Sequence, residues 1–560
     1  MKLLIYTASA ILFLAAGLLN VNAQVSYGGR PFMNEADFSA AKVLYLLPPE
    51  DPVLLNGLRK SAQNNYKKAL EFATERAVDI SPEQNGEWVV NGGTHVWRAH
   101  LISPDAYSLG VLFSEFALEN GAKLFVYDPT GKHIKGAFTE ENNKEFGQFY
   151  VGHLPGEEVV VELQTDDPGR VYGNLRIGTL SHAFLPVYAE KSIDYTGLGT
   201  SQACEIDINC TEGEEWQILK RSVCHISTTT QLCTGTLINN TSYNGKPYII
   251  TAEHCINKDF YAEKSVFYFG YENSECFVED GQKNLSVSGS TLIATGDSID
   301  FTLVKLSKMP PGEYNVYYAG WDVRKKGHLS SVTLHHPNAD AMKITVDKDP
   351  TMEPAFLPGD LNDYILKSNY WISIWDIGTT EGGSSGGPLF NSSKKLIGVL
   401  SGGLASCGDS VGYNAETDRV IFSLFGNEDD YFSKLYFAWD HYPTISKQLK
   451  HWLDPANTGQ LVIGGLNSMT VQARHRFKAE GLLQMYPNPA REMFTIELPL
   501  YTGRQMGIEM YDMTGRRVYA RSHASVFPVT VSVEGLSAGI YMIRVRGEER
   551  NLTGRVVVER

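Results

Sequence analysis

Short apolar runs alternate with polar turns along most of the chain, which is the pattern of β-strands. Between residues 24 and about 190 the runs "GVLFSEFAL", "KLFVYD" and "EVVVELQ" are separated by Gly, Asp and Pro, which favour turns. The pattern predicts a β-sandwich here. This part carries no cysteine and no cluster of catalytic residue types.

The region from about 192 to 466 also consists of short strand-like runs, and ends in "TISKQLKHWL", whose apolar residues recur at helical spacing. A polar stretch at 467–480 predicts a linker, and residues 481–560 predict another all-β unit. Because 560 residues exceed what one core usually serves, several domains are expected. The chain is predicted to be mainly β and modular.

The first residues, "MKLLIYTASAILFLAAGLLNVNAQ", predict a secretory signal peptide over 1–23, cleaved near Ala23 after the small-residue pattern "VNA". A membrane anchor is disfavoured because this apolar run is short for a bilayer span, and no later segment is long enough. The mature protein is therefore expected to be exported and to have no integral membrane segment.

The composition of the chain excludes one class of binding partner and locates the disulfides. The net charge of −15, without a basic run or patch, argues against nucleic acid. The seven cysteines all fall between residues 200 and 410, which indicates one disulfide-stapled domain, and their odd number leaves one thiol unpaired. Cys224 is the candidate, because "RSVCHIS" reads as a buried strand. Zinc is disfavoured, because no CxxC pair or His/Cys ligand spacing occurs.

A histidine and an acid stand at strand ends in the cysteine-bearing region. In "YIITAEHC" an apolar strand leads to His254, and a bridge between Cys255 and Cys233 would limit the drift of a general base. In "GDSIDFTLVKL", Asp300 directly precedes an apolar strand, where a buried carboxylate would orient the histidine. Asp297 is the rival, but it lies in the polar turn.

The glycine-rich stretch "GGSSGGP" supplies a nucleophile. Ser385 is followed by Gly-Gly-Pro, and its backbone N–H and that of Gly383 suit an oxyanion hole, so Ser384 is interpreted as a spacer. The order His254, Asp300, Ser385 is that of the chymotrypsin fold and differs from the orders of subtilisins and α/β-hydrolases.

The motifs "ITAEHC", "DFTLVKL" and "EGGSSGGPLF" resemble the chymotrypsin-fold serine endopeptidases, and "CEIDINC", "AGWDVR", "HHPN", "SGGLASC" and "HWLDPANTG" resemble the bacterial lysyl endopeptidases over about 200–466. The resemblance implies a double β-barrel and no metal or other cofactor, with the adjacent His335 and His336 as part of the scaffold. It also implies three disulfides and leaves Cys224 unpaired. The implied pairs are Cys204–Cys407, Cys210–Cys276 and Cys233–Cys255.

The same resemblance bears on specificity. The acid of trypsins lies six residues before the nucleophile, where this chain has Thr379. In lysyl endopeptidases the acid follows the nucleophile in a run similar to "DYFSKLYFAW", which implies that Asp430 binds the substrate ammonium; a solvated acidic loop is the alternative. Other acids to test are Glu416, Asp418 and Asp429. Two further features stay open: Ser401 stands where the family has a histidine, and the pocket tryptophan is Trp371 or Trp375.

The flanks resemble a protease propeptide ("THVWRAHLISPDAYSLG") and a type IX secretion sorting domain ("MYPNPAREMFTIEL", "LSAGIYMIRV"). The expected domains are a signal peptide (1–23), a β-rich propeptide (24–191), a serine endopeptidase (192–466), a linker (467–480) and a sorting domain (481–560). The resemblance implies delivery outside the cell or to its surface, with the type IX machinery and lysine-containing proteins and peptides as partners.

The leading hypothesis is a secreted endopeptidase that cuts after lysine. An endopeptidase of other or broader specificity is the first alternative, and a binding protein on a dead protease scaffold is the second. Maturation is expected near Lys191, in the polar connector "YAEKSIDYTGLGTSQAC", so that the active form begins at or near Ser192.

Overall fold

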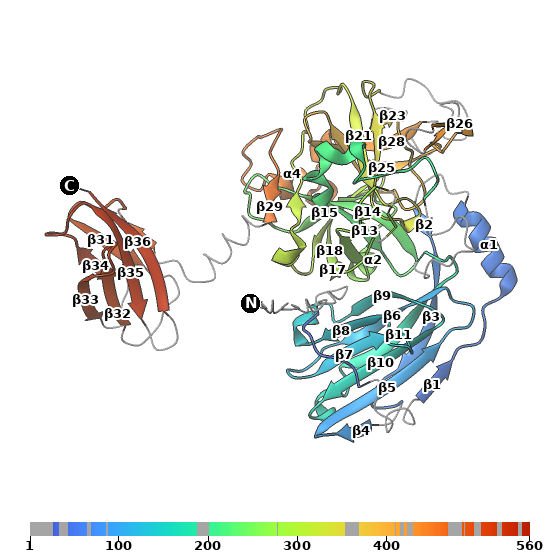
Figure 1. The fold of residues 1–560 in the computed structure, drawn as a ribbon, viewed down its shortest axis with the longest axis horizontal. Coiled ribbons are helices and arrows are strands. Elements are labelled where there is room, and N and C mark those ends of the chain that lie inside the picture. Colours follow the sequence, from blue (N-terminus) through green and yellow to red (C-terminus); the bar gives the residue numbers. More distant parts are fainter. Residues whose placement is uncertain are drawn as a thin grey trace, which may run out of the picture. The chain divides into compact units, whose positions relative to one another are not determined.

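The protein is described by a computed structural model. It describes residues 26–32, 43–63, 69–85, 88–187, 201–276, 278–279, 281–352, 369–408, 410–414, 419–422, 429–468, 484–486, 488–497, 506–523, 529–546 and 551–559. The chain divides into two compact units, Met1–Asn467 and Ser468–Arg560 (Figure 1). The predicted signal peptide, the connector around Lys191 and most of the predicted linker lie outside the described residues.

The N-terminal part of the first unit is a sandwich of two sheets. The first sheet has the order β1-β5-β10-β7-β8, with β4 beside β5, and the second has the order β3-β11-β6-β9. Their strands are β1 (Val43–Leu46), β3 (Ala73–Ile80), β4 (Trp88–Asn91), β5 (Thr94–Ile102), β6 (Ser108–Phe116), β7 (Lys123–Tyr127), β8 (Ile134–Phe138), β9 (Phe149–Pro155), β10 (Glu158–Thr165) and β11 (Leu175–Ala183). Trp97 and Leu163 from the first sheet share a buried cluster with Phe113 and Leu180 from the second. The predicted sandwich is confirmed.

One helix in this part was not predicted. α1 (Pro52–Gln63) begins with proline at its first position, and Asp51 Oδ1 accepts a hydrogen bond from Val53 N at 2.8 Å. Leu55, Leu58 and Ala62 recur at helical spacing and pack into an apolar cluster. The signal was present in the sequence, within a region interpreted only as strands.

The central part is built from two larger sheets with antiparallel pairing between neighbours. The first contains β13 (Val223–Ser227), β14 (Gln231–Ile238), β15 (Tyr248–Thr251), β16 (Val266–Phe269), β17 (Leu285–Ser288), β18 (Ser290–Gly296) and β19 (Phe301–Leu306), with β2 (Leu70–Glu71) added from the N-terminal part. The second contains β12 (Ile206–Asp207), β21 (Ser331–His335), β22 (Lys343–Asp347), β23 (Tyr370–Ser373), β24 (Pro388–Asn391), β25 (Leu396–Gly403) and β28 (Asp430–Lys434). The smaller pairs are β20 (Tyr317–Tyr318) with β29 (Leu466–Asn467), and β26 (Ser410–Asn414) with β27 (Arg419–Phe422). This mainly β, chymotrypsin-like arrangement confirms the predicted fold class.

The helices of the central part are short: α2 (Asp259–Glu263), α3 (Leu435–Asp440) and α4 (Lys450–Leu453). The helix predicted over "TISKQLKHWL" is therefore largely wrong. This stretch instead contains a 3₁₀ turn at Ile445–Lys447 and then α4, and Gln448 between them adopts an extended backbone conformation. No helix in the described parts of the chain is both long and apolar enough to cross a membrane.

The C-terminal unit is a separate pair of antiparallel sheets, of orders β30-β31-β34 and β33-β32-β35-β36. Its strands are β30 (Gln484–Tyr486), β31 (Met493–Glu497), β32 (Met506–Tyr511), β33 (Arg517–His523), β34 (Val529–Ser532), β35 (Gly539–Arg546) and β36 (Asn551–Val558). Phe494 and Val531 from the first sheet and Ile508, Ile543 and Val556 from the second form one buried core. The predicted all-β unit is confirmed here, as a two-sheet sandwich.

Candidate active site

Three residues predicted from separate motifs lie within hydrogen-bond distance of one another. His254 Nε2 lies 2.7 Å from Ser385 Oγ, and His254 Nδ1 lies 2.9 Å from Asp300 Oδ2. The backbone N–H of His254 also donates to Asp300 Oδ1 at 3.1 Å. The imidazole is thus fixed from both sides, as a general base beside a nucleophile requires.

The three residues come from both large sheets. His254 follows β15 and Asp300 precedes β19, which pairs with β15, so sheet pairing brings them together. Ser385 precedes β24 in the other sheet, and its carbonyl accepts a hydrogen bond from Thr234 N of β14 at 2.7 Å. Asp297, the rival acid, instead accepts a hydrogen bond from Ser298 N.

Asp300 is buried but held ionised. Burial acts to raise its pKa, whereas the charge of His254 and hydrogen bonds from His254 and Ser401 outweigh that effect and lower it. Ser401 is the residue that departs from the family histidine, and its hydroxyl donates to Asp300 Oδ2. Ser433 Oγ donates to the carbonyl of Asp300 at 3.1 Å. Neither serine role was visible in the sequence, because the partners lie far apart along the chain.

The loop 379–387, called the nucleophile loop after the role predicted for Ser385, needs glycine at two positions. Gly383 has φ +95°, and a Cβ there would lie 2.7 Å from the carbonyl oxygen of His336. Gly386 has φ +81°, and a Cβ there would collide with the Thr234 carbonyl and the Thr251 hydroxyl. A side chain at 383 would therefore push the loop away from the segment that follows β21 in its own sheet, and one at 386 would push it away from β14 and β15 of the opposite sheet.

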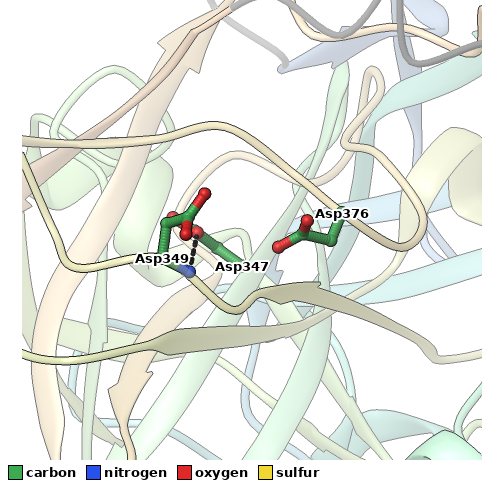
Figure 2. A group of neighbouring side chains, drawn as sticks. All are labelled: Asp347, Asp349 and Asp376. Atoms are coloured by element: carbon green, nitrogen blue, oxygen red, sulfur yellow. Dashed lines mark hydrogen bonds between the residues drawn. The ribbon is translucent and has the colours of Figure 1, made fainter.

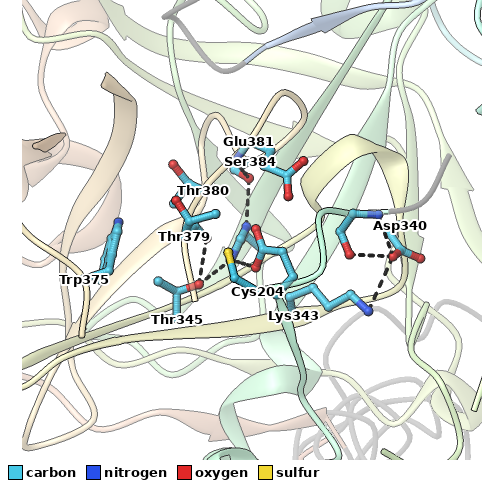
Figure 3. A network of polar contacts seen from close by, with 12 residues as sticks. Cys204, Asp340, Lys343, Thr345, Trp375, Thr379, Thr380, Glu381 and Ser384 are labelled. Carbon is cyan, nitrogen blue, oxygen red and sulfur yellow. Dashed lines mark hydrogen bonds and ion pairs between the residues drawn. The ribbon is translucent and has the colours of Figure 1, made fainter. Parts of the chain in front are cut away.

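Ser384 has a structural role beyond that of a spacer. Its buried hydroxyl lies 2.8 Å from His335 Nδ1 and accepts a hydrogen bond from Glu381 N at 3.0 Å. His335 Nε2 lies 2.9 Å from Thr345 Oγ1, which donates to the carbonyl of Thr379 at 2.8 Å. Figure 3 shows Ser384, Glu381, Thr345 and Thr379 of this network. The network ties both ends of the segment between Thr379 and Ser384 to the scaffold.

The adjacent histidine also serves the scaffold. His336 Nδ1 lies 3.1 Å from the carbonyl oxygen of Asp340. The backbone N–H of His336 donates a hydrogen bond to Thr234 Oγ1 at 3.1 Å. Burial lowers the pKa of His336 to about 3, so the ring stays neutral.

Asp430 lies fully buried at the start of β28. Its Oδ2 accepts hydrogen bonds from Trp375 Nε1 at 2.7 Å and from Thr380 Oγ1 at 2.5 Å. A Cβ at Gly403 would collide with Oδ1 and with the Asp429 carbonyl, so glycine at this position permits the close approach of β25 to β28. Because Thr380 belongs to the nucleophile loop, Asp430 borders the same site as Ser385.

The two tryptophans left open by the sequence take different places. Trp375 contacts Asp430, whereas the ring of Trp371 lies 4.2 Å from the Lys434 ammonium and packs against Tyr436. Asp429 is half-buried and lies 3.5 Å from the hydroxyl of Tyr431. The other two alternative acids, Glu416 and Asp418, lie outside the described residues.

The first described residues after the connector are bound beside the nucleophile loop. Gln202 N donates to Glu381 Oε1 at 2.8 Å, and Ser201 N and Oγ donate to Asp340 Oδ2 at 3.0 and 2.7 Å. Lys343 forms an ion pair with Asp340 at 3.4 Å. The start of the central domain is therefore anchored to the loop that carries Ser385.

The structure contains the three disulfides that the resemblance implied, Cys204–Cys407, Cys210–Cys276 and Cys233–Cys255. Cys224 is unpaired and buried, as expected, and burial raises the pKa of its thiol. The Cys233–Cys255 bridge joins β14 to the residue that follows His254.

Three carboxylates gather away from this site. Asp347, Asp349 and Asp376 have oxygen atoms within 4.8 Å of one another (Figure 2). Burial and the charges of the other two aspartates raise the pKa of Asp347 to about 6. The backbone N–H of Lys348 donates to Asp376 Oδ2 at 2.7 Å and so partly compensates the negative charge of the cluster.

Comparison with known proteins matches this central region. Residues 198–419 match the family model "Lysyl endopeptidase, C-terminal domain". The resemblance to lysyl endopeptidases is confirmed. A lysyl endopeptidase of Pseudomonas aeruginosa is 25% identical over 275 residues, which cover 46% of this chain and 57% of that protein. The match thus spans little more than half of that relative's own length.

Two solved structures are among those that the chain matches over its central region. An inactive Ser-to-Ala mutant of Rv3671c from M. tuberculosis is 14% identical, covering 42% of this chain and 91% of that one with a TM-score of 0.26. Glu endopeptidase in complex with MPD is 16% identical, covering 38% and 85% with a TM-score of 0.22. The assignment of the central domain to the chymotrypsin-like serine peptidase type rests on its sheets and its lysyl endopeptidase match.

The C-terminal unit has its own match. Residues 484–559 match the family model "Secretion system C-terminal sorting domain". This type IX sorting domain indicates secretion, and its presence is compatible with attachment to the outer-membrane surface.

Proposed function

We propose that the protein is a secreted serine endopeptidase in which Ser385 is the nucleophile, His254 the general base and Asp300 the orienting acid. The observation that carries the proposal is the continuous hydrogen-bonded chain from Asp300 through His254 to Ser385 Oγ. The lysyl endopeptidase match of the same domain supports it. No cofactor takes part.

The geometry supports acyl transfer through a covalent intermediate. Ser385 Oγ attacks the scissile carbonyl while His254 Nε2 takes its proton and then passes that proton to the leaving amine. The ionised Asp300 stabilises the imidazolium that forms between these steps. The backbone N–H groups of Gly383 and Ser385 would hold the oxyanion, and water then hydrolyses the acyl-enzyme.

Preference for lysine before the scissile bond is the finer part of the proposal, with Asp430 as the acid that pairs with the substrate ammonium. Asp430 is buried and accepts a hydrogen bond from Thr380 of the nucleophile loop. A lysine carries a compact charge on an apolar stem and suits a buried carboxylate, whereas the planar arginine fork needs more room and a different donor geometry.

Experiments can distinguish the proposed function from two alternatives. An endopeptidase of broader specificity would cut a peptide library after residues other than lysine. A binding protein on a dead scaffold would show neither cleavage nor labelling of Ser385 by a fluorophosphonate. We expect labelling that is lost in Ser385→Ala, and cuts that follow lysine.

The domain organisation completes the proposal. We infer a signal peptide over 1–23, a propeptide over 24–191, an endopeptidase domain over 192–466, a linker over 467–480 and a sorting domain over 481–560. Lysine-containing proteins and peptides are the proposed substrates, and the type IX machinery is the proposed partner in export. Lys191 is the proposed maturation site.

A further inference from the structure

A short strand of the N-terminal part is paired into the sheet that carries His254. β2 lies antiparallel to β14, with Leu70 opposite Leu232 and Glu71 opposite Gln231. The N–H of the next residue, Phe72, continues this pairing by donating a hydrogen bond to the carbonyl of Thr230 in the central domain at 3.0 Å. The N-terminal part therefore adds an extended segment to an edge of the peptidase domain, as a bound peptide does.

This edge of β14 leads directly to the proposed catalytic residues. Cys233, the next residue of β14, is bridged to Cys255 beside His254. Thr234, one residue further, donates its N–H to the carbonyl of Ser385 at 2.7 Å. A strand on this edge thus ends within a residue or two of the nucleophile.

The side chain of Leu70 also lies against the loop before the nucleophile. A Cβ at Gly382 would come 3.3 Å from Leu70 Cδ1, and Leu70 shares a buried apolar cluster with Leu232 and Ala339. Ser385 has no exposed surface in the full-length chain. The segment is therefore packed against the loop that carries Ser385.

The direction of the reaction assigns β2 to the leaving-group side. His254 Nε2 must hand a proton to the leaving amine, so the residues after the scissile bond run past His254 and its bridged neighbour Cys233. The residue before the bond extends the other way, toward Asp430. β2 occupies the place of residues that follow a scissile bond.

The register then identifies the bond. Leu70 faces Leu232; continued by one residue, the antiparallel register would set Ala69 opposite Cys233, and we assign the bond on the amino side of Ala69 to Ser385 on that basis. Lys68 lies outside the described residues and enters only as the residue that precedes Ala69 in the sequence. It is a lysine, the residue that the proposed pocket accepts.

We propose that the full-length chain binds its own Lys68–Ala69 bond as a substrate and cuts it intramolecularly. The inference rests on the proposed function and deepens it by naming a substrate bond. Ser385 Oγ bonds to the carbonyl carbon of Lys68, its proton passes through His254 to the nitrogen of Ala69, and the C–N bond breaks. Water then releases the carboxylate of Lys68 and restores the Ser385 hydroxyl.

The test follows the new terminus in the purified full-length protein. Mass spectrometry of chain termini should find a fragment that begins at Ala69, and Ser385→Ala should give none. Lys68→Gln should lower its yield at least about 30-fold, because the pocket acid then meets no ammonium. Lys67→Gln, a change at the adjacent lysine, is the matched control and should change the yield by less than about threefold.

Two further measurements separate the possible failures. The cut should proceed at the same rate constant when the protein is diluted about tenfold, as an intramolecular step requires; a rate that falls with dilution overturns the seated-strand argument. Fluorophosphonate labelling and cleavage of a lysine peptide library are measured on the same samples. Labelling and library cleavage without an Ala69 terminus, or equal effects of Lys68→Gln and Lys67→Gln, overturn the inference and leave the proposed function standing. Absence of the Ala69 terminus together with absence of labelling and library cleavage overturns the proposed function itself.

Discussion

At the scale of single residues, two adjacent serines with the same hydroxyl have different surroundings. Ser385 Oγ faces His254, whereas Ser384 Oγ is occupied by His335 and by the N–H of Glu381. Side-chain chemistry is identical, so the direction that the loop gives each hydroxyl decides which one can react.

Ser385→Ala should therefore lower amide hydrolysis by roughly a million-fold, as loss of a triad nucleophile typically does. Ser384→Ala should keep most of the activity, within about tenfold, and lower the free energy of unfolding by about 1–3 kcal/mol, because His335 loses a buried partner. Steady-state hydrolysis of a lysine peptide and thermal unfolding measure the two effects. An inactive Ser384→Ala that still folds would mean that the nucleophile has been assigned to the wrong serine.

The pocket acid gives a second residue-scale prediction. Asp430→Asn should lower hydrolysis of Lys-X bonds at least about 100-fold, since the substrate ammonium would lose its buried partner. Labelling of Ser385 by a neutral fluorophosphonate should change little. Asp429→Asn is the matched control and should retain lysine preference. Retained preference in Asp430→Asn would redirect the search to Asp429, Glu416 and Asp418.

At the scale of elements, strand pairing brings distant motifs together. β15 and β19 are neighbours, so a histidine after one and an aspartate before the other meet. The link from Thr234 of β14 to Ser385 then joins the two sheets at the site. Glycine at 386 permits that close approach, and glycine at 383 lets the loop lie against the His336 carbonyl, which explains why the nucleophile motif is so rich in glycine.

Asp347, the last residue of β22, makes the stability of the protein depend on pH. Burial raises the pKa of Asp347 from 3.8 to about 6, so the folded state resists its ionisation and loses stability as the pH rises through this range. Asp347→Asn should stabilise the protein at pH 8 by about 1–3 kcal/mol, the upper end being the full value of this pKa change. Below about pH 4 the gain should vanish, because the carboxyl is then neutral in both states.

Urea unfolding at the two pH values measures the difference between Asp347→Asn and the parent protein. Asp349→Asn, at an exposed member of the same cluster, is the control and should have a smaller effect. A gain from Asp347→Asn that is as large at pH 4 as at pH 8 would contradict the electrostatic origin.

At the scale of the whole molecule, the chain is bound near the active site on both sides of the connector. β2 of the N-terminal part pairs with β14, whereas Ser201 and Gln202, at the start of the central domain, bind Asp340 and Glu381. Glu381 lies on the loop that carries Ser385. Cleavage within the connector would leave this anchor in the mature domain.

Maturation should therefore remove roughly residues 24–191 and leave an active form that begins at or near Ser192. Terminal sequencing of the purified active enzyme tests this expectation. Lys191→Gln should slow the appearance of that terminus if the enzyme makes the cut itself. An active form that begins upstream of about Asp51 would contradict the assignment of this region as a propeptide.

Much of the site could be predicted from short stretches of sequence, because each stretch carries its own steric requirement. The nucleophile loop needs small residues, the histidine follows an apolar strand, and Asp300 precedes another; the structure brings all three together. The helix at "TISKQLKHWL" was predicted wrongly, since apolar spacing alone does not show that Gln448 adopts extended backbone. α1 was missed because its apolar spacing lay in a region interpreted as strands.

By itself the sequence determined the β architecture, the cysteine-bearing domain, the candidate nucleophile and base, and the secretion tail, because all of these depend on local patterns. Only the tertiary structure decided that Asp300 rather than Asp297 faces His254, and that Trp375 rather than Trp371 contacts Asp430. It alone revealed the partner of Ser384 and the pairing of β2 with β14. These contacts join residues far apart in the chain, and their formation depends on how whole sheets pair and pack, which no short stretch of sequence specifies.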